Sequence, residues 1–128
     1  FWLAAAQARA GNRLGDVAHA VQQHAEDNGY SVIRDLCGHG IGREMHEEPD
    51  VPNFGKPGRG IRLEAGMTIA IEPMIAKGRW PVYIGSNGWT VITRDHSLAS
   101  HYEHTIAVTT GEPEILTFPG ANLREAIR

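Results

Sequence analysis

The sequence predicts an α+β fold in a single domain, residues 1–128, with helices first and mostly antiparallel strands after them. Within the first 28 positions apolar residues recur at helical spacing, whereas from residue 67 onward short runs have the alternation of half-buried strands. An Asn-Gly pair at positions 87 and 88 separates two such runs, which is typical of a β-hairpin. Helices followed by consecutive strands favour an α+β arrangement.

Two helices are expected at the start of the chain. Residues 3–10 are alanine-rich and resemble the end of a helix that stops near Gly11. Residues 14–28 carry an apolar stripe at helical spacing, and Gly29 follows as a stop. The segment 52–66 is rich in proline and glycine and is expected to form an irregular connection.

A meander of short strands is expected after these helices. The predicted strands cover residues 31–34, 67–76, 82–84, 89–93, 101–109 and 114–117. The turn between residues 84 and 89 is predicted to be type I′, with positive φ at both Asn87 and Gly88.

Composition argues against several kinds of partner. The formal net charge is −3 with seven histidines counted as neutral, so no basic surface indicates binding to nucleic acid or anionic lipid. No apolar run approaches the roughly 20 residues that a membrane-spanning helix needs. The one cysteine, Cys37, cannot form an internal disulfide, which is typical of a reducing compartment. We therefore expect a cytoplasmic protein without nucleic-acid or membrane partners.

Residues 37–49 form the most unusual stretch of the chain. They contain two histidines, three glutamates and three glycines without helical or strand periodicity. We expect His39 to lie in a glycine-rich turn, where Gly38, Gly40 and Gly42 allow positive φ and a close approach of the backbone to a metal or substrate. No GxGxxG or Walker lysine is present, so a nucleotide site is rejected.

Two carboxylates, Glu72 and Glu103, interrupt runs that otherwise resemble buried strands. Because strand side chains alternate, each carboxylate shares a face with small residues such as Ala70 and Thr105. Neighbouring strands would aim both acids into one cavity, where buried carboxylates need a cation or a raised pKa. Salt bridges to arginines are the alternative. With His39 and no thiolate, the set suits Mn, Fe, Co or Zn in a catalytic site.

Four motifs in order carry a family resemblance. They are Gly-His-Gly-Ile-Gly at 38–42, His-Glu-Glu-Pro at 46–49, Ile-Glu-Pro-Met at 71–74 and Tyr-Glu-His-Thr at 102–105. Together they resemble the type I methionine aminopeptidases of the pita-bread metallopeptidase fold, from end to end of the chain. The resemblance implies two divalent ions (Co, Mn, Fe or Zn) bound by His39, Glu72 and Glu103, with Glu103 bridging them. It also implies that Glu72 is the general base for the attacking water.

The same resemblance assigns residues that contact substrate. His46 would hydrogen-bond the scissile amide and stabilise the tetrahedral intermediate, while Met45 and Trp89 would line the pocket for the methionine side chain. The alternative explanations are a position on an acidic surface loop for His46 and core packing for Trp89. The implied substrates are the N-terminal methionines of peptides and nascent chains, cleaved by a monomeric enzyme.

The family pattern also places two aspartate ligands and a substrate histidine upstream of the first helix. No aspartate of this chain stands in that context. We therefore expect a partial catalytic domain that lacks its N-terminal part and is inactive when isolated. Two alternatives are open: a proline-directed peptidase of the same fold, of the aminopeptidase P or prolidase type, and a non-catalytic relative that binds peptides or proteins.

Overall fold

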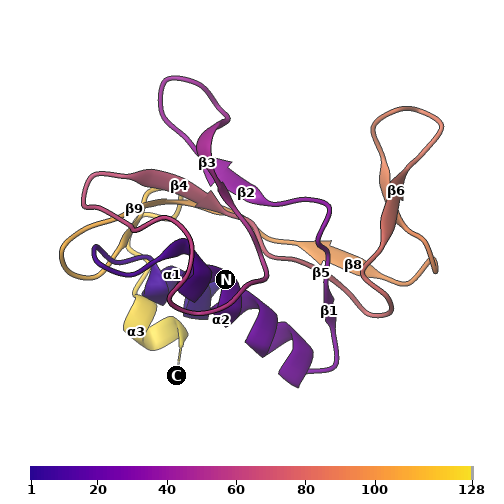
Figure 1. The fold of residues 1–128 in the computed structure, drawn as a ribbon, viewed down its shortest axis with the longest axis horizontal. Coiled ribbons are helices and arrows are strands. Elements are labelled where there is room, and N and C mark those ends of the chain that lie inside the picture. Colours follow the sequence, from indigo (N-terminus) through magenta and orange to yellow (C-terminus); the bar gives the residue numbers. More distant parts are fainter. Residues whose placement is uncertain (128) are drawn as a thin grey trace.

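A computed structural model describes residues 1–127 (Figure 1). The helices of this part are α1 (Trp2–Gln7), α2 (Leu14–Asp27) and α3 (Leu123–Ala126). The strands are β1 (Ser31–Val32), β2 (Gly38–Gly40), β3 (Glu47–Val51), β4 (Thr68–Ile71), β5 (Met74–Ala76), β6 (Val82–Ile84), β7 (Val91–Thr93), β8 (Ala99–His101), β9 (His104–Ala107) and β10 (Glu114–Ile115). The α+β prediction is confirmed.

The two predicted helices are present, and the first ends earlier than expected. It stops at Gln7 because the side-chain amide of Asn12 donates to the Gln7 carbonyl at 2.9 Å, and the Ala10 N–H donates to Thr109 instead of continuing the helix. Helix α3 was not predicted. It begins at Asn122, whose side chain accepts the N–H of Arg124.

All strand pairs are antiparallel and form three sheets. The largest has the order β10-β9-β4-β2-β3, the second the order β1-β5-β8, and β6 pairs with β7 alone. The largest sheet is not the meander that the sequence predicted, because β4 pairs with β2 rather than with the preceding strand β3. In Figure 1 the β6 hairpin projects away from the remaining strands.

Each of the two longest predicted strands is split where its glutamate lies. Residues 67–76 divide into β4 and β5, and residues 101–109 divide into β8 and β9. The pairing of β4 with β9 and of β5 with β8 sets Glu72 opposite Glu103 and Pro73 opposite Tyr102. Pro73 has no N–H and cannot continue the ladder, so the two interruptions coincide and the strands pass from one sheet to another at this point.

The two faces of the β4–β9 ladder have different environments. On one face Ile69, Ile71 and Ile106 are fully buried and belong to the same core cluster as Val17 and Val21 of α2. Burying an isoleucine side chain stabilises the fold by about 1.5–3 kcal/mol, so this face anchors the sheet on the helices. The other face carries the small residues that the alternation predicts, and Glu72 and Glu103 continue that face.

The loop between β6 and β7 differs from the predicted type I′ turn. Only Gly88 of the Asn-Gly pair has positive φ, at 72°. The Gly88 N–H donates to the carbonyl of Gly85, and the side-chain oxygen of Asn87 accepts the N–H groups of Trp89 and Thr90 at 3.1 and 3.0 Å. An asparagine side chain that binds the backbone in this way supports a wider loop than a two-residue turn.

The ends of several elements and the connection between β3 and β4 can also be compared with the prediction. Strands β1 and β10 are two residues shorter than predicted, and β2 and β3 occupy a stretch that was expected to contain a turn. The segment between β3 and β4 is irregular, as predicted.

Among residues 1–127 no helix is both long enough and apolar enough to cross a membrane.

Candidate metal centre

His39 lies in a central strand of the largest sheet, not in the glycine-rich turn that was predicted. It is the middle residue of β2, paired with Asp50 on one side and Ala70 on the other. The flanking glycines do not have positive φ. A Cβ at Gly38 would overlap the backbone oxygen of Ala70, and one at Gly40 would overlap that of Glu48. The glycines are therefore needed for close packing of neighbouring backbones.

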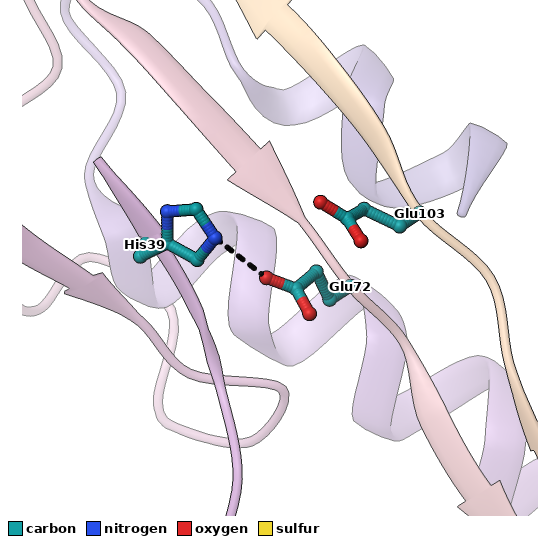
Figure 2. Close-up of side chains that lie close together, drawn as sticks. All are labelled: His39, Glu72 and Glu103. Carbon is teal, nitrogen blue, oxygen red and sulfur yellow. Dashed lines mark ion pairs between the residues drawn. The ribbon is translucent and has the colours of Figure 1, made fainter. Parts of the chain in front are cut away.

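The strands bring three possible metal donors together (Figure 2). One ligand atom from each of His39, Glu72 and Glu103 lies within 4.8 Å of the others. The Nε2 atom of His39 is 3.1 Å from Oε1 of Glu72, and both side chains are largely buried, whereas Glu103 is partly exposed. The sequence placed these acids on one face of neighbouring strands, and their register explains why they converge.

The hydrogen bonding of His39 bears on whether a cation fits here. Its Nδ1 atom lies 2.8 Å from the carbonyl oxygen of Gly40, and a carbonyl can only accept, so Nδ1 carries the hydrogen. In the neutral ring Nε2 is then a lone pair that faces the Glu72 carboxylate. Two acceptors at that distance need either a proton or a metal ion between them. An imidazole whose orientation is fixed by a backbone carbonyl, together with two carboxylates, is a donor set that suits a divalent ion.

The arginine salt bridges offered as an alternative explanation of the two acids are not formed in residues 1–127. The ion-pair partners of Glu72 are His39 and His101, and that of Glu103 is His101. Arginines pair instead with Glu26 and Glu112, away from these strands.

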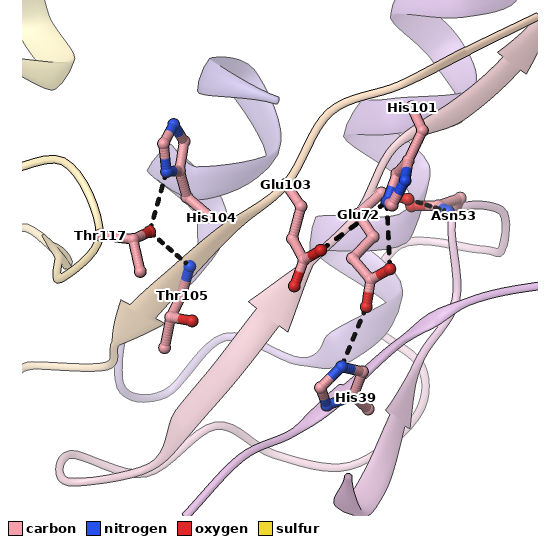
Figure 3. A network of polar contacts seen from close by, with 8 residues as sticks. All are labelled: His39, Asn53, Glu72, His101, Glu103, His104, Thr105 and Thr117. Carbon is pink, nitrogen blue, oxygen red and sulfur yellow. Dashed lines mark hydrogen bonds and ion pairs between the residues drawn. The ribbon is translucent and has the colours of Figure 1, made fainter. Parts of the chain in front are cut away.

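His101 is a neighbour of the acids that the sequence analysis did not single out. Its Nε2 atom lies 3.1 Å from Oε2 of Glu72 and 3.9 Å from Oε2 of Glu103 (Figure 3). It ends β8 directly before the interruption. The available signal was the alternation itself, since His101 and Glu103 are two residues apart and share a face.

Asn53 supports the backbone of Glu72. This side chain is 1% exposed, and its Nδ2 donates to the backbone oxygen of Glu72 at 2.7 Å. The bond satisfies a carbonyl just beyond β4, where the ladder is interrupted. No sequence pattern connects positions 53 and 72, because the contact spans 19 residues through an irregular segment.

A cleft of about 660 Å³ adjoins the donors. It is lined by Leu36, Cys37, Gly38, His39, His46, Glu47, Glu48, Asp50, Glu72, Met74 and His101. The ring centroid of His46 is 4.2 Å from that of His39, so the predicted substrate histidine stands beside the donor cluster. The loop before β3 is held by Glu47, whose Oε1 accepts the N–H of Glu44 at 2.9 Å.

The two predicted pocket residues do not line this cleft. Met45 is 70% exposed on the loop before β3, and Trp89 is 86% exposed at the β6–β7 loop. The core-packing explanation for Trp89 is therefore wrong.

Cys37 lines the cleft as a neutral thiol. Burial raises the pKa of this thiol, and the negative charge of the nearby Asp50 carboxylate raises it further. A group that holds its proton more tightly than usual is a poor thiolate ligand. The candidate metal donors are thus the imidazole and the two carboxylates.

Proteins that are similar to this chain in sequence include methionine aminopeptidases. A methionine aminopeptidase of Clostridium acetobutylicum is 57% identical over 107 residues, which cover 84% of this chain and 43% of that protein. Methionine aminopeptidase 1 of Bacillus subtilis is 43% identical over 111 residues, covering 87% of this chain and 45% of that protein. The chain thus spans less than half the length of these relatives.

Solved structures of other proteins resemble this chain in fold. Methionine aminopeptidase from Thermotoga maritima superimposes with a TM-score of 0.88 at 50% identity, covering 91% of this chain and 47% of that one. The prolidase from Pyrococcus horikoshii gives a TM-score of 0.64 at 24% identity and covers 94% of this chain and 29% of that one, a likeness in fold alone. The sequence profile of Metallopeptidase family M24 matches residues 2–110. The chain therefore belongs to metallopeptidase family M24 and has the pita-bread fold of that family.

Proposed function

We propose that this chain is part of a methionine aminopeptidase, a metal-dependent hydrolase that removes the N-terminal methionine from peptides and nascent proteins. The observation that carries the proposal is the convergence of His39, Glu72 and Glu103, whose ligand atoms lie within 4.8 Å of one another beside a cleft. The relatives named methionine aminopeptidase, at up to 57% identity, support this substrate over the proline-directed alternative.

The proposed site holds two divalent ions, with Co, Mn, Fe and Zn as candidates. His39, Glu72 and Glu103 would hold the ions from this chain, with Glu103 as the ligand shared by both. Bound divalent ions supply an activated water and polarise the scissile carbonyl. Two cations need more negative charge than two carboxylates provide, so further acidic ligands from outside this chain belong to the proposal, and residues 1–128 alone are expected to bind metal weakly.

The chain's own residues handle the protons and the orientation of the substrate. Glu72 takes the proton of the attacking water and passes it to the leaving amine, a role for which its position beside His39 in the lining of the cleft is suitable. His46, whose ring lies 4.2 Å from that of His39 between centroids, donates a hydrogen bond to the reacting amide and favours the charge that develops there. We place the enzyme in the cytoplasm as a monomer.

A peptide-release assay on the protein expressed from its complete gene tests this function. With added Mn²⁺ or Co²⁺, the protein is expected to release methionine from Met-Ala-Ser and to leave an Xaa-Pro dipeptide uncut. The Glu103→Ala variant should lose this activity, while Glu64→Ala, which changes an exposed glutamate in the irregular segment before β4, should keep it.

Each other result of this assay has a definite meaning. Cleavage of the Xaa-Pro dipeptide in place of Met-Ala-Ser would assign a proline-directed peptidase. No hydrolysis of either peptide by folded, metal-supplemented protein would favour the non-catalytic binding relative. Full activity in Glu103→Ala would reject the donor set.

A further inference from the structure

The Glu72 carboxylate contacts a different imidazole with each of its oxygens (Figure 3). Oε1 lies 3.1 Å from Nε2 of His39, and Oε2 lies 3.1 Å from Nε2 of His101. His39 is oriented by its bond to the Gly40 carbonyl, which leaves its Nε2 as an acceptor when the ring is neutral. The function proposed above uses His39 but gives His101 no role.

We propose that His101 is a positioning residue that donates its Nε2 hydrogen to Oε2 of Glu72 and so turns Oε1 toward the metal donors. This inference rests on the proposed metal function of the site. Partners of metal-binding carboxylates commonly act in this way, by fixing the rotation of the ligand.

Glu72 needs such a partner because its local structure fixes only its backbone. Asn53 holds the backbone oxygen at 2.7 Å, and the residue lies just past the end of β4. The Glu72 side chain has several rotatable bonds. A hydrogen bond to one carboxylate oxygen restricts rotation about all of them. His101 reaches this oxygen from β8, a strand of the neighbouring sheet, so the contact also joins the two sheets at the interruption.

The arrangement favours a hydrogen-bond donor over a fourth ligand, because the described ligand atoms that lie within 4.8 Å of one another belong to His39, Glu72 and Glu103 and not to His101. The His101 nitrogen is closer to Glu72 than to Glu103, 3.1 Å against 3.9 Å, as expected for one directed N–H···O bond. Its side chain is 51% exposed, whereas that of His39 is 13% exposed. His101 therefore borders the donor cluster from its solvent side.

Metal affinity of the protein from the complete gene tests this role independently of turnover. Mn²⁺ dissociation constants from calorimetry are compared for the wild type, His101→Ala, His101→Gln and a surface control, His19→Ala on α2. We expect His101→Ala to weaken Mn²⁺ binding by about 10- to 100-fold, the usual effect of removing a partner of a ligand. His101→Gln should restore most of the affinity, because its amide N–H can donate to the same oxygen, and His19→Ala should bind as the wild type does.

Two results would overturn the inference. Wild-type affinity in His101→Ala would mean that Glu72 needs no such partner. Affinity in folded His101→Gln as low as in His101→Ala, with one fewer nitrogen donor in the electron spin-echo spectrum of bound Mn²⁺, would make His101 a ligand. His39→Ala separates this inference from the proposed function, since unchanged binding in that variant would reject the metal site itself. Far-ultraviolet circular dichroism of each metal-free variant checks folding.

Discussion

The paired strands that carry the donors and the loops that carry Met45 and Trp89 are built on different principles. Glu72 and Glu103 lie opposite each other where two antiparallel ladders meet, one of them anchored on a buried isoleucine face, so their separation is set by the backbone bonds on both sides. Met45 and Trp89 lie on loops held by a few local hydrogen bonds and are mostly exposed. Chemistry that depends on ångström-scale distances is thus located where pairing fixes the geometry.

The largest effect is expected from Glu72→Gln, which keeps the size and shape of the side chain and removes its negative charge. The variant loses both a ligand charge and the proposed base, so kcat for Met-Ala-Ser should fall at least about 100-fold. Steady-state kinetics with saturating Mn²⁺ measure this, with Glu64→Gln as the matched exposed control. A kcat within threefold of the wild type would show that Glu72 is not the base.

Gly40→Ala changes the strand that holds His39. The new Cβ would overlap the backbone oxygen of Glu48, and because backbone cannot move aside cheaply, we expect a loss of about 1–3 kcal/mol in the free energy of unfolding. Urea denaturation measures the loss. Gly111→Ala is the control, since its Cβ would meet only the Thr109 hydroxyl at 3.9 Å. Equal stability of the two variants would contradict the close packing of β2 and β3.

Gly42→Ala tests the loop two residues away. Its Cβ would lie 2.7 Å from Oε2 of Glu47, the far end of a flexible side chain that can move. We expect a stability change below about 0.5 kcal/mol, as for most surface substitutions. The displaced Glu47 would release the Glu44 N–H and loosen the loop that carries His46, so kcat/KM should fall severalfold. Unchanged kcat/KM would mean that Glu47 does not position this loop.

Trp89→Ala should have the smallest effect on folding. An indole that is 86% exposed contributes little burial, so the free energy of unfolding should change by less than about 0.5 kcal/mol. Ile106→Ala, in the buried face of the ladder, should cost about 2–5 kcal/mol by comparison. A loss of similar size in both variants would show that the hairpin packs against the rest of the protein.

The same contrast explains what the sequence could predict. Alternation placed Glu72 and Glu103 on the small-residue face of two strands, because a period of two depends only on local spacing. It did not predict that both strands break at these residues, since the break depends on Pro73 meeting Tyr102 across the ladder.

Features that depend on contacts between distant residues were missed. His39 was expected in a turn because three glycines usually indicate flexibility, whereas here two of them allow neighbouring strands to approach. The support of Glu72 by Asn53 spans 19 residues, and no local pattern encodes it. The core-packing alternative for Trp89 was wrong for a similar reason, because an aromatic residue beside a strand resembles core in sequence.

Anomalous diffraction from crystals of the complete gene product grown with Mn²⁺ tests the central claim most directly. The account predicts a manganese peak within bonding distance of Nε2 of His39 and of the carboxylates of Glu72 and Glu103. A peak only among the cleft acids Glu47, Glu48 and Asp50, or no peak near His39, would contradict it.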